Sequence, residues 1–290
     1  MAALDDILGS PQAVIVPGVY DALSARVAAR AGAKLLYLTG FGVAGAGFGV
    51  PDIGLVSAVQ MIERVGVMAA ATAPVPLIAD GDNGHGGPLN AAQLTRAFEQ
   101  AGAAGIQLED QVLPKRCGHM ENKEVVSLAE AAQKIHAAAD ARKSTAFKII
   151  ARTDARATHG LDEALKRGAA FLSSGADILF IEAPQSQDEL RRIGETFRGV
   201  PLVANIVEDG KTPLLAPNEF AALGFKILLY PISALLAVTR RLETAYDHLL
   251  KGEREKLDTD RAAFDHYNAI MKLPEFLAVT NALARTNYEE

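Results

Sequence analysis

Eight short and nearly continuous apolar runs recur along the chain, and they are its strongest structural signal. Each run is rich in β-branched and aliphatic residues and lacks the alternation of a half-exposed strand, as expected of strands that are buried on both faces. The runs span residues 13–18, 34–40, 74–82, 104–110, 147–154, 177–183, 200–208 and 225–231. This pattern predicts parallel strands.

Segments with helical spacing of apolar residues lie between these runs. The clearest are residues 21–33, 90–103, 127–142, 161–176 and 186–199. Several end in Ala-Gly-Ala or Ser-Gly-Ala just before the next strand, where glycine suits the left-handed residue that follows a helix. Strand and helix in eightfold repetition predict an α/β protein with a (β/α)8 TIM barrel, and a doubly wound open sheet is the alternative.

Three further helices are predicted after the eighth strand, at residues 232–252, 253–273 and 274–290. A barrel needs only the first of them. The predicted division is therefore a catalytic barrel domain over residues 1–250 and a C-terminal helical arm over residues 251–290. The arm is amphipathic, so its apolar face would pack either on another subunit or back on its own barrel.

Composition and charge exclude several classes of function. The chain has 290 residues, a length that suits one large domain. With 29 basic and 35 acidic residues, its net charge of -6 gives no basic surface for nucleic acid. The apolar runs are shorter than the about 18 residues of a membrane span, so no membrane partner is expected. A single cysteine and an acidic N-terminal stretch favour a cytoplasmic location.

Polar residues end the predicted strands, and active sites of TIM barrels lie at these carboxyl ends. These residues are Thr39, Asp80, Asp82, Glu109, Asp110, Arg152, Asp154, Glu182, Asn205, Glu208 and Ser233. The carboxylates of Asp80, Asp82 and Glu109 would repel one another in a shielded site unless a cation neutralised them. Ligands that are all oxygen favour Mg2+, with Mn2+ also possible. Helix caps or salt bridges in the loops are the alternative interpretation.

Two residues carry the remaining candidate chemistry. Arg152 ends an apolar strand, so its guanidinium needs a carboxylate partner, either Glu182 or a substrate. Cys117 is the only cysteine and has basic neighbours, which stabilise a thiolate and suit acid–base chemistry near neutral pH. An inert cysteine is the alternative. The glycine-bearing loop around Cys117 could close over the mouth of the barrel.

Several motifs resemble those of the isocitrate lyase and phosphoenolpyruvate mutase superfamily. They include DGDNGHGG at 80–87, LEDQVLPKRCGH at 108–119, IIARTDA at 149–155 and ANIVEDGKTP at 204–213. The KRCGH sequence is typical of the carbon–carbon lyase branch. The resemblance implies a barrel whose eighth helix is exchanged between subunits of a dimer, with two dimers forming a homotetramer.

The resemblance also implies roles for individual residues. Mg2+ would be held by Asp82 directly and by others largely through water, and the metal-site residues are Asp52, Asp80, Asp82 and Glu109. The residues expected to bind a small dicarboxylic acid are Thr39, Gly40, Phe41, Asp80, Gly118, Asn205 and Ser233. The residues expected to act in catalysis are Lys115, Cys117, His119, Arg152, Glu182 and Tyr37. Among these, Tyr37 is the candidate base, and Phe41 departs from the small residue that the superfamily often has there.

The expected reaction is cleavage of a 2-alkylmalate, and the leading case is 2,3-dimethylmalate, which would give propanoate and pyruvate. Cys117 would protonate the enediolate that forms when the C2–C3 bond breaks. Leu236 stands where lyases acting on tricarboxylates have an arginine, which argues against methylisocitrate. Oxaloacetate hydrolase, methylisocitrate lyase and carboxyphosphonoenolpyruvate phosphonomutase activities are alternatives. A non-catalytic barrel that uses its C-terminal helices for assembly is an alternative of a different class.

Overall fold

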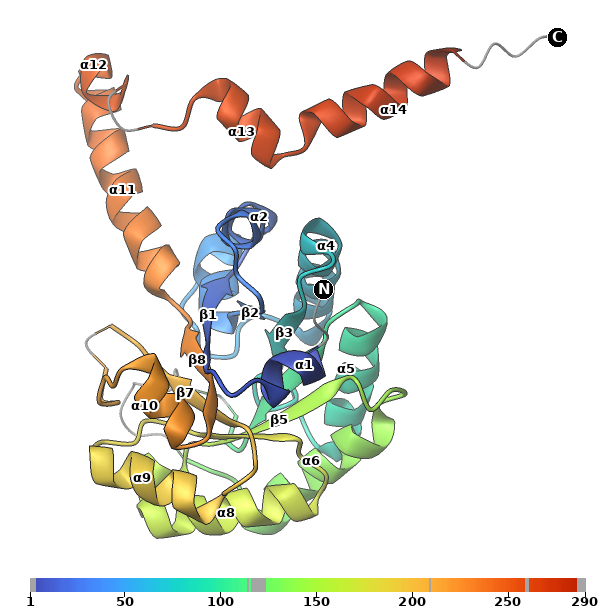
Figure 1. Cartoon of the computed structure of the whole chain (residues 1–290), viewed down its shortest axis with the longest axis vertical. Helices are drawn as coiled ribbons and strands as arrows, with labels where there is room; N and C mark the ends of the chain where they lie inside the picture. The colour runs from blue at the N-terminus through green and yellow to red at the C-terminus, as the bar shows by residue number, and fades with distance from the viewer. Residues whose placement is uncertain (1–3, 114, 116–123, 209, 259–260, 286–290) are drawn as a thin grey trace, which may run out of the picture. The chain divides into compact units, whose positions relative to one another are not determined.

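A closed barrel of eight parallel strands forms the centre of the structure (Figure 1). The computed structural model describes residues 4–113, 115, 124–208, 210–258 and 261–285. The strands are β1 Val14–Val19, β2 Leu36–Leu38, β3 Leu77–Asp80, β4 Gly105–Glu109, β5 Lys148–Thr153, β6 Ile178–Ile181, β7 Leu202–Asn205 and β8 Phe225–Tyr230. Because β1 pairs with both β2 and β8, the sheet has no free edge. The predicted TIM barrel is confirmed.

Helices follow the strands around the barrel. They are α1 Leu4–Gly9, α2 Ala22–Arg30, α3 Gly40–Gly42, the π-helix η1 Val43–Gly47, α4 Ala58–Thr72, α5 Pro88–Gln100, α6 Leu128–Ala141, α7 Ala155–His159, α8 Leu161–Ser173, α9 Gln187–Thr196 and α10 Pro217–Ala222. Side-chain caps fix several starts: Ser127 accepts from the backbone of Glu130 at the start of α6. The five helices predicted most clearly from spacing all form.

Apolar side chains fill the inside of the barrel. One buried cluster joins Val16, Ile78, Ile150, Phe180 and Val203 from different strands. Leu4 and Ile7 of α1 belong to the same cluster, so α1 packs against the barrel interior. The barrel is therefore a solid core, and polar side chains can gather at the carboxyl ends of its strands.

The chain divides into two compact units, Met1–Ala234 and Leu235–Glu290. The helices of the C-terminal part are α11 Ser233–Leu250, α12 Arg254–Asp258, α13 Phe264–Ile270 and α14 Leu273–Arg285. The segment 253–273, which was predicted as one helix, thus contains two. Large apolar side chains of these helices are exposed, among them Leu250 at 88% and Phe276 at 64%.

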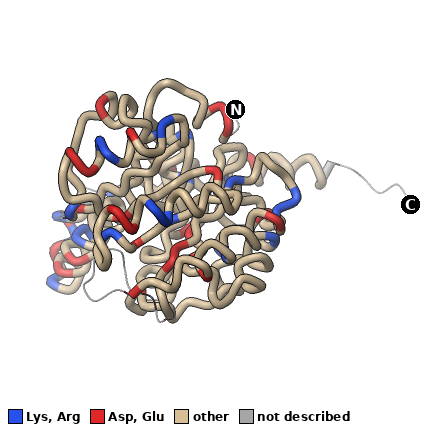
Figure 2. Tube along the Cα trace, turned by 90° about the horizontal axis from the view of Figure 1, so that it is seen from below, with Lys and Arg blue, Asp and Glu red and all other residues tan. Residues whose placement is uncertain are grey.

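Figure 2 shows Lys and Arg interspersed with Asp and Glu along the described trace. Within the described residues, none of the helices has the length and apolar character that crossing a membrane requires.

Candidate active site

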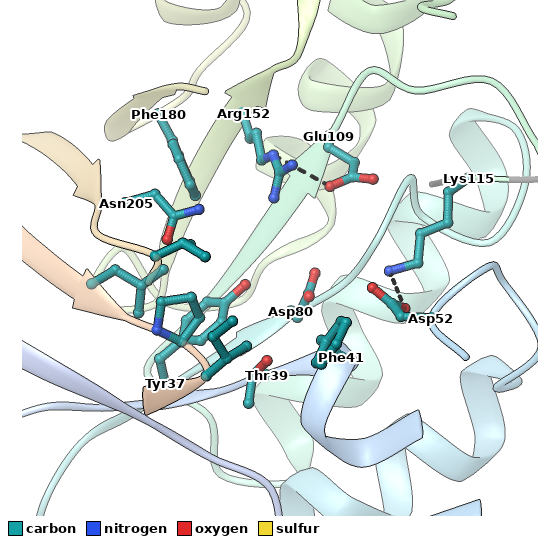
Figure 3. Close-up of a pocket in the computed structure, with 14 residues that line it drawn as sticks. Tyr37, Thr39, Phe41, Asp52, Asp80, Glu109, Lys115, Arg152, Phe180 and Asn205 are labelled. Atoms are coloured by element: carbon teal, nitrogen blue, oxygen red, sulfur yellow. Dashed lines mark ion pairs between the residues drawn. The ribbon is translucent and has the colours of Figure 1, made fainter. Parts of the chain in front are cut away.

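A pocket of about 130 Å3 lies at the carboxyl ends of the strands (Figure 3). Its lining consists of Tyr37, Thr39, Phe41, Asp52, Asp80, Glu109, Lys115, Arg152, Phe180, Asn205, Val207, Leu229, Pro231 and Ile232. Five of the eleven polar residues predicted from strand ends line this pocket: Thr39, Asp80, Glu109, Arg152 and Asn205. Gly40, Asp82 and Glu182 do not line the pocket but contact residues that do. Ser233 is not a lining residue, and Cys117, Gly118 and His119 lie outside the described residues.

Asp80, the last residue of β3, is held by three hydrogen-bond donors. Its Oδ1 accepts from the backbone nitrogen of Asp82 at 3.0 Å and from Nε2 of Gln107 at 3.2 Å. Its Oδ2 accepts from the backbone nitrogen of Gly40 at 3.2 Å. These donors fix the carboxylate at the pocket wall and stabilise its charge.

Gly40 allows the chain after β2 to approach this carboxylate closely. A Cβ atom added to Gly40 would lie 2.9 Å from Oδ2 of Asp80, which is closer than a carbon and an oxygen normally approach. The following residues turn into α3, where Oγ1 of Thr39 accepts from the backbone nitrogen of Gly42. A larger residue at position 40 would have to displace Asp80.

Lys115 brings a buried positive charge to the acidic side of the pocket. Its Nζ lies 2.7 Å from Oδ1 of Asp52 and also forms an ion pair with Asp82. Burial raises the pKa of Asp82 to about 7; Lys115 opposes this effect, whereas Asp80 and Asp52 add to it. Burial lowers the pKa of Lys115, but the surrounding carboxylates outweigh it and hold that pKa well above its usual value.

Asp82 also has an unusual backbone conformation. Its φ is 50°, in the left-handed region that side chains other than glycine rarely adopt. This turn directs the backbone nitrogen of Asp82 to Asp80 and its carboxylate to Lys115. Uncommon conformations of this kind persist where surrounding contacts determine them, often at functional sites.

Glu109, the last residue of β4, is buried in the pocket wall with few partners. Its Oε2 lies 3.4 Å from Nε of Arg152. Its Oε1 is buried and has no hydrogen-bond partner among the described residues. Burial raises the pKa of Glu109 well above its usual range, and Arg152 offsets only part of this effect. An oxygen with these properties is suited to a cation or to a ligand that donates a hydrogen bond.

Arg152 is held in place from several sides. Asp154 accepts from its Nε at 2.9 Å and from its Nη2 at 3.0 Å, which is a bidentate pair. Its guanidinium lies 5.1 Å from the centre of the Phe180 ring, and its Nη2 lies 3.7 Å from Oε1 of Glu182. Burial lowers the pKa of Arg152, but Asp154, Glu182 and Glu109 outweigh it and raise that pKa well above its usual value. The main carboxylate partner is thus Asp154, which the sequence indicated as a strand-end residue but not as the partner of Arg152.

Tyr37 and Gln107 connect β2 to the acidic side of the pocket. The hydroxyl of Tyr37 donates to Oε1 of Gln107 at 2.7 Å, and Gln107 in turn donates to Asp80. Burial, assisted by Asp80, raises the pKa of Tyr37 well above 10. A phenol that keeps its proton in this way is a poor base at neutral pH, which does not favour that role for Tyr37. Gln107 was not predicted, although a polar residue within the apolar run 104–110 is a usable signal.

The side of the pocket formed by β7 and β8 is mainly apolar. We call Val207, Leu229, Pro231 and Ile232 the apolar wall. Asn205 is the polar residue beside it: Nδ2 donates to both carboxylate oxygens of Glu182 at 3.3 Å. Its Oδ1 is buried without a hydrogen-bond partner among the described residues. A ligand would therefore meet charged groups on one side of the pocket and apolar groups on the other.

The acidic residues fit a hard divalent cation by their chemistry. Within the described part of the chain, no three His, Cys, Asp or Glu side chains form a ready-made metal cluster. However, Asp52, Asp80, Asp82 and Glu109 offer only oxygen atoms, and burial raises the pKa of Asp82 and Glu109. Carboxylates that are buried together with raised pKa values gain stability from a nearby positive charge, and oxygen ligands suit Mg2+.

Known proteins resemble this chain over nearly its whole length. It is 42% identical to 2,3-dimethylmalate lyase of Eubacterium barkeri, an alignment that covers 98% of both chains. It is 40% identical to the petal death protein of Dianthus caryophyllus, over 90% of this chain and 82% of the other.

Solved structures show the same fold. A crystal structure of 2,3-dimethylmalate lyase matches with a TM-score of 0.91 and 33% identity, covering 99% of this chain and 96% of the other. Oxaloacetate acetylhydrolase with 3,3-difluorooxalacetate matches with a TM-score of 0.91 and 31% identity, over 99% and 97% of the two chains. Phosphonopyruvate hydrolase with oxalate and Mg2+ matches with a TM-score of 0.85 and 29% identity, over 98% of each chain.

The sequence model of the phosphoenolpyruvate phosphomutase family matches residues 4–250, which include the whole barrel and the pocket. Together with the relatives that share more than a third of its residues, this match extends the resemblance from single motifs to the complete fold. The chain is therefore an enzyme of the phosphoenolpyruvate mutase/isocitrate lyase superfamily.

Proposed function

We propose that this enzyme is a Mg2+-dependent carbon–carbon lyase that cleaves a small 2-alkylmalate, with 2,3-dimethylmalate as the leading substrate. The two-sided pocket carries the proposal. Its charged side offers Arg152 and the carboxylates of Asp80 and Glu109, whereas its other side is the apolar wall. A malate with short alkyl groups has matching polar and apolar parts, and the similarity to 2,3-dimethylmalate lyase supports the same choice.

The number of cationic groups limits the substrate to a small acid. In the described lining, Arg152 and Lys115 are the basic residues, and both already face carboxylates. A third substrate carboxylate would lie against the apolar wall without a partner, at a cost of several kcal/mol. Leu236 belongs to α11 in the C-terminal unit, and its apolar side chain at a position where an arginine is expected for a tricarboxylate supports the same choice.

We assign the divalent cation to Asp52, Asp80, Asp82 and Glu109. When bound, Mg2+ would neutralise their charge and polarise an oxygen of the substrate. The residues of the chain prepare this site: Gly40 and Gln107 orient Asp80, and Lys115 balances Asp52 and Asp82. Thr39 and Phe41 would contact the substrate near its 2-hydroxyl group and the adjacent carboxylate.

The proposed reaction breaks the bond between C2 and C3. A general base accepts the 2-hydroxyl proton while a carbonyl group forms at C2, which leaves pyruvate, and this proton afterwards returns through solvent to the thiolate of Cys117. The electron pair of the broken bond moves to C3 and its carboxylate, and the thiol of Cys117 gives its proton to C3, which completes propanoate. Arg152 and Asn205 hold the substrate carboxylates during this change, with Glu182 behind them. The role of Cys117 as proton donor comes from the resemblance, because Cys117 lies outside the described residues.

We further propose a homotetramer built from helix-exchanged dimers. Two exposed apolar surfaces support it. Ile15, on the outer side of β1, is 53% exposed, although this side of a barrel strand is normally covered by a helix. On α11, Leu242, Tyr246 and Leu250 are also exposed. Light scattering should give the mass of four chains, and a stable monomer would contradict the proposal.

A product screen tests the activity directly. The purified enzyme is incubated with Mg2+ and either 2,3-dimethylmalate, methylisocitrate or oxaloacetate. We expect pyruvate from the first at a much higher kcat/KM than from methylisocitrate. Pyruvate from methylisocitrate without any from dimethylmalate would refute the substrate choice. Acetate and oxalate from oxaloacetate would instead support the hydrolase alternative, for which the structural similarity to oxaloacetate acetylhydrolase is the relevant observation.

The variant Cys117→Ser tests the proton donor. A hydroxyl is a far weaker acid than a thiol, so we expect turnover to fall by at least about 10^2-fold while Mg2+ and oxalate still bind. Unchanged turnover would remove Cys117 from the mechanism. If a non-catalytic barrel were the correct description, no substrate in the screen would react with the unmodified enzyme.

A further inference from the structure

A buried hydrogen-bond network behind the pocket connects Asp110 to Arg152. Asp110 follows Glu109 at the end of β4 and is 2% exposed. Glu109 lines the pocket, whereas Asp110 points to the other side of the strand, toward β5 and α8. Neither the proposed substrate nor the proposed metal contacts Asp110, so its role has to be found in what it holds.

Three donors converge on the Asp110 carboxylate. Its Oδ2 accepts from Oγ1 of Thr153 at 2.6 Å and from Nη1 of Arg167 at 3.0 Å. Its Oδ1 accepts from the backbone nitrogen of Asp154 at 2.9 Å. Thr153 and Asp154 are the residues that directly follow Arg152, so Asp110 fixes the backbone at the point where β5 ends.

The next contact reaches the pocket. Asp154 is fully buried, and its carboxylate accepts from both Nε and Nη2 of Arg152. A bidentate pair defines the plane of a guanidinium as well as its position. A change in the backbone of Asp154 would therefore rotate the guanidinium that faces Glu109 and Glu182.

We propose that Asp110 is a positioning residue for Arg152: by fixing Thr153 and Asp154 it sets the orientation in which Arg152 meets a substrate carboxylate. The inference rests on the proposed function in one respect, since it assumes that Arg152 binds a carboxylate ligand. Arg167 neutralises Asp110 from α8 and is itself paired with Glu163 at 3.0 Å, so the network is anchored in the helical layer. The orientation of Arg152 thus depends on Asp110 and Arg167, an ion pair that does not contact the substrate.

The experiment is a double-mutant cycle between Asp110→Asn and Arg152→Lys in the full-length enzyme with Mg2+. Asn at position 110 keeps the acceptor for the Asp154 nitrogen but removes the charge that faces Arg167. We expect Asp110→Asn to lower kcat/KM about 10- to 100-fold, chiefly by raising KM, and to weaken oxalate binding by a similar factor. In the Arg152→Lys background the same change should have less than about a threefold effect, because its target is gone.

A purely structural role for Asp110 predicts a different result, namely the same loss in both backgrounds, and that result would overturn the proposal. Thr153→Val is a second variant, for use if Asp110→Asn does not fold. It removes a single donor from Asp110 and should give a smaller loss of kcat/KM and of oxalate affinity.

Glu163→Gln is the matched control, because it removes the outer partner of Arg167 at a partly exposed position. We expect it to change kcat/KM by less than about twofold. If the unmodified enzyme turns over no 2-alkylmalate, the proposed function fails, and oxalate affinity alone then decides the cycle.

Discussion

The two sides of the pocket differ in how their residues are held. On the charged side, Asp80 has three hydrogen-bond donors and Arg152 has a bidentate partner, so each group has one defined orientation. On the apolar side, Val207 and Ile232 contribute only shape. Proteins that share a reaction need charged groups held in one defined orientation. Their substrates can differ when the shape of the apolar side differs. The comparison suggests that the charged side sets the chemistry of the superfamily and the apolar wall selects the substrate.

The largest effect should come from the charged side. We expect Glu109→Gln to lower turnover of the preferred 2-alkylmalate by about 10^3-fold and to weaken Mg2+ binding, because it removes a buried negative charge from the metal site. Steady-state kinetics and calorimetric titration of Mg2+ measure the two effects. Glu63→Gln, on the exposed side of α4, is the matched control and should leave both unchanged. If Glu109→Gln behaved like the control, the assignment of the charged side would be wrong.

A smaller loss of Mg2+ affinity is expected from a change at Gly40, whose backbone nitrogen supports the carboxylate of Asp80. Gly40→Ala places a methyl group 2.9 Å from Oδ2 of Asp80 and should displace this carboxylate, which weakens Mg2+ binding by about 10- to 100-fold. Gly45→Ala provides a control on the adjacent π-helix, since a Cβ atom there meets nothing within 4 Å. Equal Mg2+ affinity for the two variants would show that the position of Asp80 does not depend on Gly40.

Changes on the apolar side should alter selectivity rather than chemistry. Ile232→Ala shortens a side chain of the apolar wall and so widens the pocket. We expect the preference between 2-ethylmalate and 2-methylmalate to shift toward the larger substrate by about tenfold in kcat/KM. Because the side chain of Ile232 has no polar atom that could bind a cation, Mg2+ affinity should not change. A general loss of activity toward all 2-alkylmalates, with no shift in preference, would contradict the division between the two sides.

The smallest effect concerns stability and pH. The pKa of Asp82 is raised to about 7, so between the usual carboxyl pKa and 7 the folded protein binds more protons than the unfolded chain. In EDTA, the free energy of unfolding should therefore decrease as pH rises through this window, by up to about 1 kcal/mol per pH unit. Urea titrations at several pH values measure this slope, and Asp82→Asn should reduce it, while Glu109, whose pKa burial also raises, contributes the remainder. An unchanged slope in the variant would assign the proton to another group.

The sequence predicted the barrel and the charged side well because both depend on local pattern. Continuous apolar runs locate buried strands, and a polar residue at the end of such a run must face the mouth or the helical layer. This was enough to select Asp80, Glu109, Arg152 and Asn205, all of which line the pocket. The break between α12 and α13 was missed because its described residues, Arg261, Ala262 and Ala263, are good helix formers and gave no signal of an interruption.

The sequence could not predict contacts that depend on the register of neighbouring strands. Asp110 and Asp154 looked like further residues of the mouth, but Asp110 directly follows Glu109 and faces the other side of the sheet, where it binds the end of β5. The partner of Arg152 is two residues further along its own chain, a spacing that puts both residues on one face of a strand but does not show that they pair. The apolar wall was also missed, since an apolar residue at a strand end looks the same in the sequence whether it lines a pocket or fills a core.

The adjacent carboxylates at the end of β4 have a consequence for how this site tolerates insertions and deletions. Glu109 and Asp110 have similar chemistry, but strand geometry sends them to opposite sides of the sheet. Deleting one residue within β4 would move Asp110 into the place of Glu109 and Gln111 into the place of Asp110, so that the framework carboxylate entered the pocket and Arg167 faced an uncharged amide. Changes of length before position 110 would therefore disturb the pocket and the network that supports it at the same time.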